Sequence, residues 1–235
     1  MLVQRGLAES REKAKAIIMT GVVEINGIRV DKPGHFVHVS SDIVLKQDNL
    51  PYVSRGGLKL EAALDHFSIK VHGKTLLDIG ASTGGFTDCL LQRGAKKVIA
   101  IDVGHGQFHW KLRQDDRVVL MEKTNARYLT LDVIGELSSG AVIDVSFISL
   151  RLVVPVVSTL LLDNGFIVAL IKPQFEVGRN QVGKGGVVRD PTLHDRVIDD
   201  LSRFFSERGW AVRGCIPSPI LGPKGNREFL IYITV

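Results

Sequence analysis

Residues Thr75–Asp102 read TLLDIGASTGGFTDCLLQRGAKKVIAID, and this stretch decides the fold of the chain. It begins with a short apolar run (75–79), continues through a turn of small residues (80–85) and a helical segment (86–92), and ends with a second apolar run (97–101) followed by Asp102. A strand, a glycine-rich turn, a helix and a second strand form a parallel βαβ unit, which binds its ligand at the strand ends. We therefore expect an α/β domain built on a mostly parallel sheet.

The charges in this unit favour a cofactor that carries no phosphate. Asp78 stands just before the first glycine of the turn, where it would repel the pyrophosphate that a dinucleotide-binding turn holds. S-adenosylmethionine instead has an ammonium, a sulfonium and a ribose, and Asp102 is placed to bind two ribose hydroxyls. A methyltransferase is therefore favoured over a dehydrogenase. The alternative without any ligand is that the glycines only allow the strand and the helix to pack closely.

The composition sets broad limits on the class of protein. The 235 residues are 45% hydrophobic and carry a formal net charge of +5, which permits an acidic partner such as RNA without requiring one. The two cysteines, Cys89 and Cys215, form neither a disulfide framework nor a metal-binding spacing, and this pattern predicts a cytoplasmic protein without a metal. We expect neither a signal peptide nor a segment that spans a bilayer.

Residues 1–46 are predicted to form a small α+β unit. A helix runs from a Ser10 cap to Gly21, Asn26-Gly27 turns a hairpin, and further short strands are predicted at 36–39 and 43–46. Residues 47–56 (QDNLPYVSRG) are predicted to be a linker, and 57–235 the larger domain. The cations of the unit form either a face that binds RNA phosphates or a set of solvated charges balanced by glutamates. These cations are Arg5, Arg11, Lys13, Lys15 and Arg29.

Two charged residues are predicted at the ends of later strands of the sheet. The strand at 141–145 has Asp144 near its end, and the strand at 165–171 is followed directly by Lys172. Ligands bind at this edge of an open α/β sheet. Burial or a neighbouring cation lowers the pKa of a lysine, and this is how a lysine becomes a general base at neutral pH. The alternative is a lysine whose ammonium reaches out into water from the strand end.

Other segments add charged residues near this edge. The glycine-rich stretch 174–189 carries Arg179 and Lys184 and is predicted to be either a basic loop that faces RNA or a solvated loop. Lys59 stands near the start of a predicted helix, where a cation is mildly unfavourable, so a functional role competes with that of an ordinary exposed lysine. The runs at 211–215 and 228–235 are predicted to form a hairpin appended to the sheet.

Longer strings of residues resemble two known families. RGLAESREKAKAIIMTGVVEINGIRVDKPG (5–34) resembles the RNA-binding domain first described in ribosomal protein S-four. The chain opens inside the first helix of that domain, from which we expect weaker RNA binding or a less stable module. SRGGLKL (54–60), DIGASTGGF (78–86), AIDVG (100–104), DVSFISL (144–150), IKPQFE (171–176) and NREF (226–229) resemble the TlyA family. Its members are haemolysin A-like, FtsJ/RrmJ-like methyltransferases that act on the ribose 2′-OH of ribosomal RNA.

The resemblance implies a Rossmann-like class I methyltransferase fold, with a seven-stranded sheet that is parallel except for one strand. It also implies a Lys–Asp–Lys–Glu tetrad, which the motifs place at Lys59, Asp144, Lys172 and Glu228. Lys172 would be the general base toward the 2′-hydroxyl. Lys59 would help to position the target nucleotide and favour the neutral form of Lys172 by like-charge repulsion, and the two acids would orient the lysines.

The same resemblance implies S-adenosyl-L-methionine as the cofactor and ribosomal RNA or ribosomal subunits as the partner. Asn125 would contact the adenine edge, although it could instead only shape a turn. Alternatives are an RNA-binding protein with an inactive methyltransferase domain, a membrane-active haemolysin and a dehydrogenase. The expected cofactor-binding residues are Asp78, Gly80, Ser82, Gly84, Gly85, Phe86, Asp102 and Asn125, and the expected RNA contacts add Arg55, Arg179 and Lys184 to the five cations of the N-terminal unit.

Overall fold

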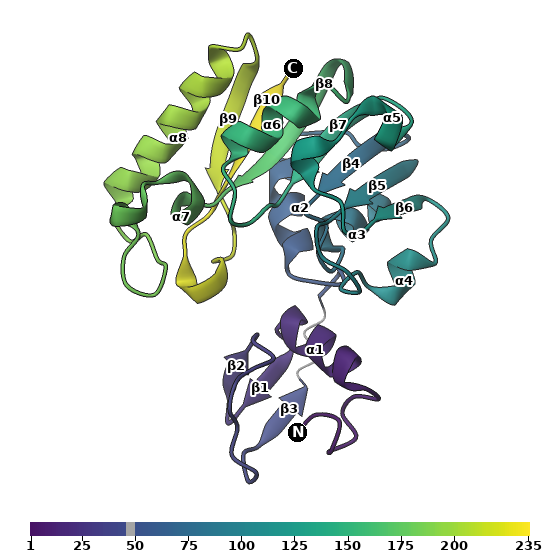
Figure 1. Ribbon diagram of the computed structural model, residues 1–235, viewed down its shortest axis with the longest axis vertical. Helices are drawn as coiled ribbons and strands as arrows, with labels where there is room; N and C mark the ends of the chain where they lie inside the picture. The colour runs from purple at the N-terminus through teal and green to yellow at the C-terminus, as the bar shows by residue number, and fades with distance from the viewer. Residues whose placement is uncertain (46–49) are drawn as a thin grey trace.

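The computed structural model describes residues 1–45 and 50–235, apart from the side chains of residues 16, 20 and 179. It consists of a small N-terminal module and a larger α/β domain, which Figure 1 shows below and above the connecting segment. Three expectations fall outside the described residues: the end of the last strand of the module at 46, the linker residues 47–49, and the side chain of Arg179.

The N-terminal module packs one helix against a three-stranded antiparallel sheet, in the order β2-β1-β3. The Ser10 hydroxyl accepts the backbone N–H of Lys13 at 3.1 Å and so caps the helix, as expected. Asn26 and Gly27 have φ angles of 51° and 77°, the pair of positive values that a tight hairpin turn requires. The elements are α1 (Arg11–Thr20), β1 (Val23–Ile25), β2 (Ile28–Val30) and β3 (Ile43–Leu45).

The prediction of a strand at 36–39 is wrong. These residues have no regular structure, and Phe36 is fully exposed. The central strand β1 pairs with β2 on one side and with β3 on the other, and the segment 36–39 pairs with none of these three strands. The apolar alternation in this segment therefore did not indicate a strand.

The larger domain is built on a seven-stranded sheet in the order β6-β5-β4-β7-β8-β10-β9. Strands β4, β5, β6, β7 and β8 are parallel, whereas β10 runs antiparallel to both β8 and β9. This confirms the predicted sheet with one antiparallel strand and the C-terminal hairpin. The strands are β4 (Thr75–Ile79), β5 (Lys97–Ile101), β6 (Val118–Met121), β7 (Ser138–Ile143), β8 (Leu161–Ile171), β9 (Ala211–Pro217) and β10 (Phe229–Thr234).

Helices cover both faces of this sheet. On one face α2 (Gly56–His66) and α3 (Gly85–Gln92) bury their apolar side chains, and on the other face α6 (Leu150–Ser158) and α8 (Pro191–Ser206) bury theirs. Successive residues of a strand point to opposite faces, so β4 sends Leu76 to the first layer and Leu77 to the second. Shorter helical turns are α4 (Trp110–Arg113), α5 (Leu131–Ile134), α7 (Pro173–Glu176), η1 (Ala126–Tyr128), η2 (Arg179–Gln181) and η3 (Pro223–Gly225).

The stretch 174–189, which was predicted to be a loop, contains regular structure. It contains α7, η2 and a bridge between Gly183 and Val187. Asn226, from the loop before β10, accepts the Val188 N–H at 3.1 Å and donates to the Gly186 carbonyl at 3.0 Å. These bonds tie the stretch to the segment that leads into Glu228, and so join two loops at the edge of the sheet where ligands are expected.

Candidate active site

Four charged side chains meet at the edge of the sheet where the parallel strands end. Asp144 directly follows β7 and Lys172 directly follows β8, while Lys59 comes from α2 and Glu228 precedes β10. Lys172 Nζ lies 2.6 Å from Asp144 Oδ1 and donates to Ser146 Oγ at 2.9 Å. Lys59 Nζ donates to Glu228 Oε2 at 2.6 Å. The structure thus brings the four residues of the expected tetrad together as two ion pairs.

These ion pairs are largely withdrawn from water. Lys59 and Lys172 are each 8% exposed and Glu228 is 2% exposed, and burial of such charges is tolerated only when they are paired. Burial would raise the pKa of Asp144, but the neighbouring cations of Lys172 and Lys59 outweigh burial and hold this pKa below its usual value. Asp144 is therefore ionised at neutral pH.

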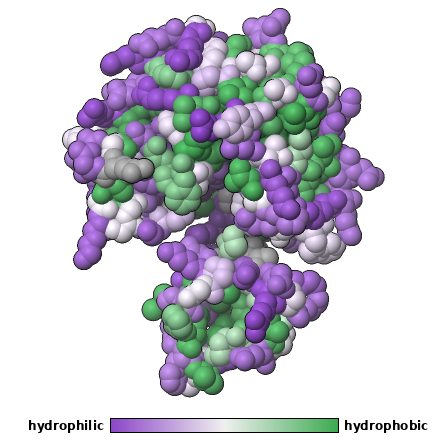
Figure 2. Space-filling model, in the orientation of Figure 1, coloured by the Kyte–Doolittle hydropathy of each residue, from purple (hydrophilic) through white to green (hydrophobic). Residues whose placement is uncertain are grey.

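The four side chains line a cavity of about 370 Å³. Its floor and one wall come from the glycine turn, through Gly80, Ser82, Gly85 and Phe86. Arg55 lines it at the start of α2, and Met19, Asp31 and Lys32 of the N-terminal module also contribute to the lining. Figure 2 shows the surface hollowed between the two parts of the molecule.

A second cavity of about 350 Å³ adjoins the first across the glycine turn. Gly80, Ser82 and Asp144 line both cavities, so the two spaces meet at the end of β4. Asp102 and Asn125 line the second cavity alone. A ligand that spans both cavities would have one end at Asp102 and the other end beside the tetrad.

Two glycines of the turn have no room for a side chain. Gly80 has a φ of 85°, and a Cβ there would lie 2.4 Å from the Asp144 carbonyl oxygen. Gly84 has a φ of 95°, and a Cβ there would lie 2.4 Å from Leu112 Cδ1. Gly80 and Gly85 line the tetrad cavity, whereas Gly84 lines neither cavity and supports the turn from behind.

Asp102 organises the backbone around the second cavity. Its carboxylate accepts the N–H of Ser82 at 2.7 Å and the N–H of Gly104 at 2.6 Å. Carboxylate oxygens have capacity for further donors, as a ribose diol would supply. The side chain of Asn125 accepts the N–H of Arg127 at 3.0 Å and caps η1, so this residue shapes a turn as well as lining the cavity.

Asp78 occupies a different position from the one expected. Its side chain is fully buried, lines neither cavity, and accepts a 2.6 Å hydrogen bond from the Thr87 hydroxyl of α3. Asp78 is followed by Ile79, which faces the opposite helical layer, so the alternation along β4 turns the carboxylate toward α3 and away from the ligand site. Burial raises the pKa of Asp78 to about 7 despite the bond from Thr87, and Oδ1 has no hydrogen-bond partner among the described residues.

The residues expected to bind RNA differ in their surroundings. Lys13 pairs with Glu9, Arg29 donates to the Gly21 carbonyl and Arg5 donates to the Val39 carbonyl at 2.6 Å, so these three also serve the module itself. Arg11, Lys15 and Lys184 are exposed. Arg55 instead lines the tetrad cavity.

Two residues at the site and one just outside it were not anticipated. Ser146 accepts the bond from Lys172, and Phe147 is 90% exposed with a φ of 64°, an unusual conformation for a large side chain. Both belong to the DVSF motif, whose exposed aromatic was a signal that could have been used. Glu122, an acid directly after β6, turns away from the second cavity and instead binds Arg113, His105 and the Gly106 N–H.

The described residues offer neither a cluster for a metal ion nor a helix that spans a membrane. No group of three or more His, Cys, Asp or Glu in the described part of the chain is arranged to hold a metal ion. Within residues 1–45 and 50–235, no helix is long and apolar enough to cross a membrane.

Comparisons with known proteins match this architecture. Residues 52–234 match the FtsJ-like methyltransferase family, and residues 1–44 match the S4 domain. YqxC of Bacillus subtilis is 53% identical over 99% of this chain and 83% of its own length. The 16S/23S rRNA (cytidine-2′-O)-methyltransferase TlyA of Mycobacterium tuberculosis is 47% identical over 99% of this chain and 87% of its own.

A solved structure of a Streptococcus thermophilus protein is 50% identical and superposes with a TM-score of 0.79, covering 99% of this chain and 86% of that one. The seven-stranded fold, the matched families and these relatives agree over nearly the whole chain. The chain belongs to the FtsJ-like methyltransferase family, in the TlyA group, and carries an N-terminal S4 domain.

Proposed function

We propose that this protein transfers a methyl group from S-adenosyl-L-methionine to a ribose 2′-OH of ribosomal RNA, with Lys172 as the general base. The observation that carries the proposal is the opening of the Lys59, Asp144, Lys172 and Glu228 cluster onto the cavity lined by the glycine turn. A cofactor bound along that turn would present its reactive end to the cluster. The N-terminal module lines the same cavity through Met19, Asp31 and Lys32, which places the module beside the cluster.

The residues present fit this cofactor. Asp102 would take the ribose hydroxyls, Asn125 the adenine edge, and the wall formed by Gly80, Ser82, Gly85 and Phe86 the methionine portion. Gly84 would support the turn without touching the cofactor. Asp78 would also contribute indirectly, because its buried carboxylate binds Thr87 and so joins the end of β4 to α3. No cation among these residues would bind a phosphate. When bound, the cofactor supplies an electrophilic methyl group.

The chain itself must hold and move one proton. The 2′-hydroxyl loses its proton as its oxygen accepts the methyl group, and Lys172 Nζ would receive that proton. Lys172 must first release a proton of its own before it can accept this one. Asp144 and Ser146 hold Nζ in place, and Glu228 holds Lys59. Much of the remaining acceleration would come from alignment of the hydroxyl with the methyl group.

The N-terminal module would supply affinity for RNA. The S4 match, the cations of the module and Arg55 in the cavity support this role, and the TlyA relative named for rRNA cytidine 2′-O-methylation supports a cytidine target. We divide the chain into an RNA-binding module at 1–46, a linker at 47–56 and a methyltransferase domain at 57–235. Arg179 and Lys184 would add contacts from the loop. Ribosomal subunits as substrate place the protein in the cytoplasm.

The test is methyl transfer from labelled S-adenosyl-L-methionine to unmodified ribosomal subunits, followed by mapping of the label to base or ribose. Ribose label that is lost in Lys172→Ala, while this variant still binds the cofactor, would support the proposal. Base label, or equal activity in Lys172→Ala, would contradict it. Cofactor binding without any transfer would favour the RNA-binding protein with an inactive domain.

A further inference from the structure

The short helix α4 presents a large aromatic side chain to solvent beside the catalytic cavity. Trp110 is 66% exposed, and its ring stacks on that of His109 with centroids 6.0 Å apart and an interplanar angle of 28°. Lys111 follows it and is also exposed. An exposed tryptophan is uncommon in a protein surface, because its apolar area is better buried.

The fold does not require a tryptophan at this position. The neighbouring residues Phe108 and Leu112 make the apolar contacts of this segment, since both are buried and both lie against Gly84. Trp110 belongs to none of the apolar clusters of the domain. The buried residues therefore anchor the segment, and the exposed ring of Trp110 is not needed for its packing.

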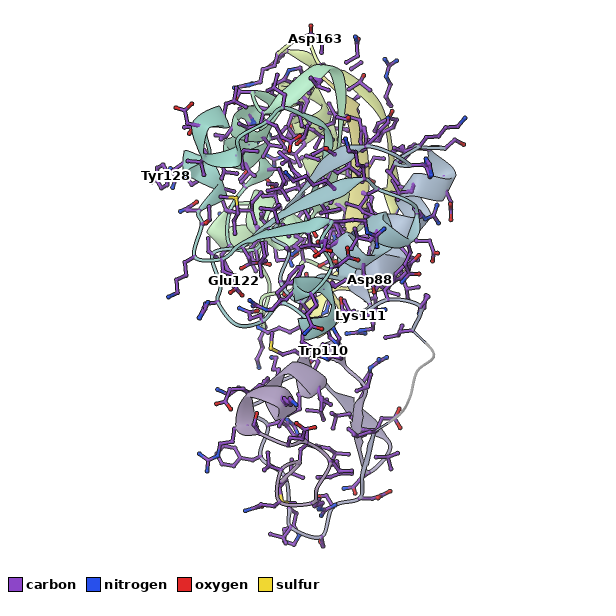
Figure 3. All side chains as sticks on the ribbon, turned by 90° about the vertical axis from the view of Figure 1, so that its right-hand side faces the viewer. Asp88, Trp110, Lys111, Glu122, Tyr128 and Asp163 are labelled. Carbon is purple, nitrogen blue, oxygen red and sulfur yellow. The ribbon has the colours of Figure 1, made fainter. Side chains whose placement is uncertain are left out.

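The helix α4 lies next to the tetrad cavity and at the end of the domain that faces the N-terminal module. The N–H of His109 donates to the carbonyl of Thr83 at 3.2 Å, and Thr83 lines the tetrad cavity. Figure 3 shows Trp110 and Lys111 at the end of the larger domain that faces the N-terminal module. An RNA strand held by the module while one nucleotide occupies the cavity would pass over this surface.

The charges around Trp110 suit a polyanion. Asp115, which interacts electrostatically with Lys111, is engaged by Arg117 at 2.7 Å. Asp88 is buried, and its carboxylate accepts the Val53 N–H and the Gln92 side chain. Asp88 and Asp115 are thus engaged within the protein, and the exposed ammonium of Lys111 is available to a phosphate.

We infer that His109, Trp110 and Lys111 form a docking surface for a single-stranded segment of the substrate RNA next to the target nucleotide. Trp110 stacks on an unpaired base and Lys111 contacts the adjoining phosphate, the combination by which proteins hold single strands. This inference rests on the proposed function, because it assigns the substrate of that function a second contact. It adds a surface that lies outside both the tetrad cavity and the N-terminal module.

The chain offers a matched control for the test. Tyr128 is 71% exposed and has a cation beside it, since Arg127 Cζ lies 5.8 Å from its ring centroid. Figure 3 shows Tyr128 away from the end of the domain that carries Trp110. Trp110→Ala and Tyr128→Ala therefore remove aromatic rings of similar exposure from two different surfaces.

The experiment measures two quantities for each variant: the KM for unmodified ribosomal subunits in methyl transfer, and the equilibrium affinity for the same subunits without cofactor. We expect Trp110→Ala to raise the KM and weaken binding by roughly 10-fold or more, because stacking on a base is lost. Trp110→Phe should recover most of the affinity. Lys111→Glu should weaken binding and reduce its dependence on salt. Tyr128→Ala should match the wild type.

Two results would overturn the inference. One is equal behaviour of Trp110→Ala and Tyr128→Ala in both measurements. The other is a loss of S-adenosyl-L-methionine affinity in Trp110→Ala as large as its loss of subunit affinity, since this would assign Trp110 to the support of the glycine turn. If the wild type binds subunits but transfers no methyl group, the proposed function fails, and the binding comparison still decides the role of Trp110.

Discussion

Lys59 and Glu228 stand 169 positions apart in the chain and meet at 2.6 Å inside the tetrad cavity. The pair joins the first helix of the larger domain to its last strand, and both residues are buried. Loss of one partner of a buried ion pair leaves an uncompensated charge, which typically costs roughly 3–5 kcal/mol.

This relationship predicts a strong coupling in stability. Glu228→Leu should lower the free energy of unfolding by roughly 3–5 kcal/mol, because Lys59 then stays buried without a counter-charge. The double variant Lys59→Met/Glu228→Leu should recover most of this loss, since both charges are removed together. Urea unfolding of the wild type, Lys59→Met, Glu228→Leu and the double variant measures the coupling. Additive losses in the two single variants would show that the pair is solvated and energetically unimportant.

Asp78 predicts a distinctive dependence of stability on pH. Its pKa is about 7 in the folded protein against 3.8 for the free side chain, so the folded state holds the proton more tightly. The contribution of Asp78 to stability is therefore fully present below about pH 4 and is lost as the pH rises to about 7. Asp78→Asn stays neutral, and its stability relative to the wild type should rise by roughly 2–4 kcal/mol over this window.

Unfolding at intervals from pH 4 to 8 measures this difference for Asp78→Asn, with Asp163→Asn as a control at an exposed position. A wild type and an Asp78→Asn variant whose stabilities run parallel across the window would show that the carboxylate is not protonated at Asp78. The difference should level off only above the folded-state pKa of about 7, where the group becomes ionised in both the folded and the unfolded state.

The local parts of this fold were predictable from the sequence. The strand, turn, helix and strand between Thr75 and Asp102 follow from signals a few residues apart, and the hairpin at Asn26-Gly27 from two adjacent residues. The segment 36–39 has the apolar content of a strand, but a strand forms only where the segment pairs with a neighbour. The segment pairs with none of β1, β2 and β3, and no local pattern encodes such pairing.

The site was predictable only in part, for a related reason. The ends of parallel strands meet at one edge of the sheet, so Asp144 and Lys172 could be placed near each other from strand positions alone. The pairing of Lys59 with Glu228 depends on closure of the whole domain and was reached through the family resemblance. Alternation along β4 could have shown that Asp78 and Ile79 face opposite layers. It could not have shown that the Thr87 hydroxyl of α3 donates a hydrogen bond to Asp78.

Gly84 predicts a sharp effect on cofactor affinity. A methyl group there would meet Leu112 Cδ1 at 2.4 Å and Phe108 Cε2 at 3.0 Å, with an unfavourable φ of 95°. Gly84→Ala should therefore displace α4 or the turn and weaken S-adenosyl-L-methionine binding by about 10-fold or more, besides a backbone penalty of about 1–2 kcal/mol in stability.

The control for this change is Gly135→Ala. Gly135 has a similar φ of 85°, but a Cβ there meets nothing within 4 Å. It should suffer the backbone penalty alone and keep its cofactor affinity. Titration calorimetry with the cofactor separates the two variants, and equal affinities would mean that the turn adapts to an alanine at Gly84.

Glu122 predicts a role in cofactor binding that does not involve contact with the cofactor. Burial would raise the pKa of Glu122, but Arg113, the Gly106 N–H and His105 together hold it below its usual value, so the carboxylate is ionised at neutral pH. These partners all lie in the segment 104–113, which also donates the Gly104 N–H to Asp102 and the His109 N–H to Thr83. Glu122 thus anchors the segment that shapes both sides of the proposed cofactor site.

Glu122→Ala should release this anchor and weaken S-adenosyl-L-methionine binding several-fold, because Asp102 loses a fixed neighbour. The kcat at saturating cofactor should stay close to that of the wild type, because the tetrad lies on other elements. Glu122→Gln keeps an acceptor for the Gly106 N–H, so its cofactor affinity should lie between those of the wild type and Glu122→Ala. Glu136→Ala, which removes an ion pair with Lys97 at the surface, is the control. A loss of kcat in Glu122→Ala without any change in cofactor affinity would contradict this role and place Glu122 in the chemical step.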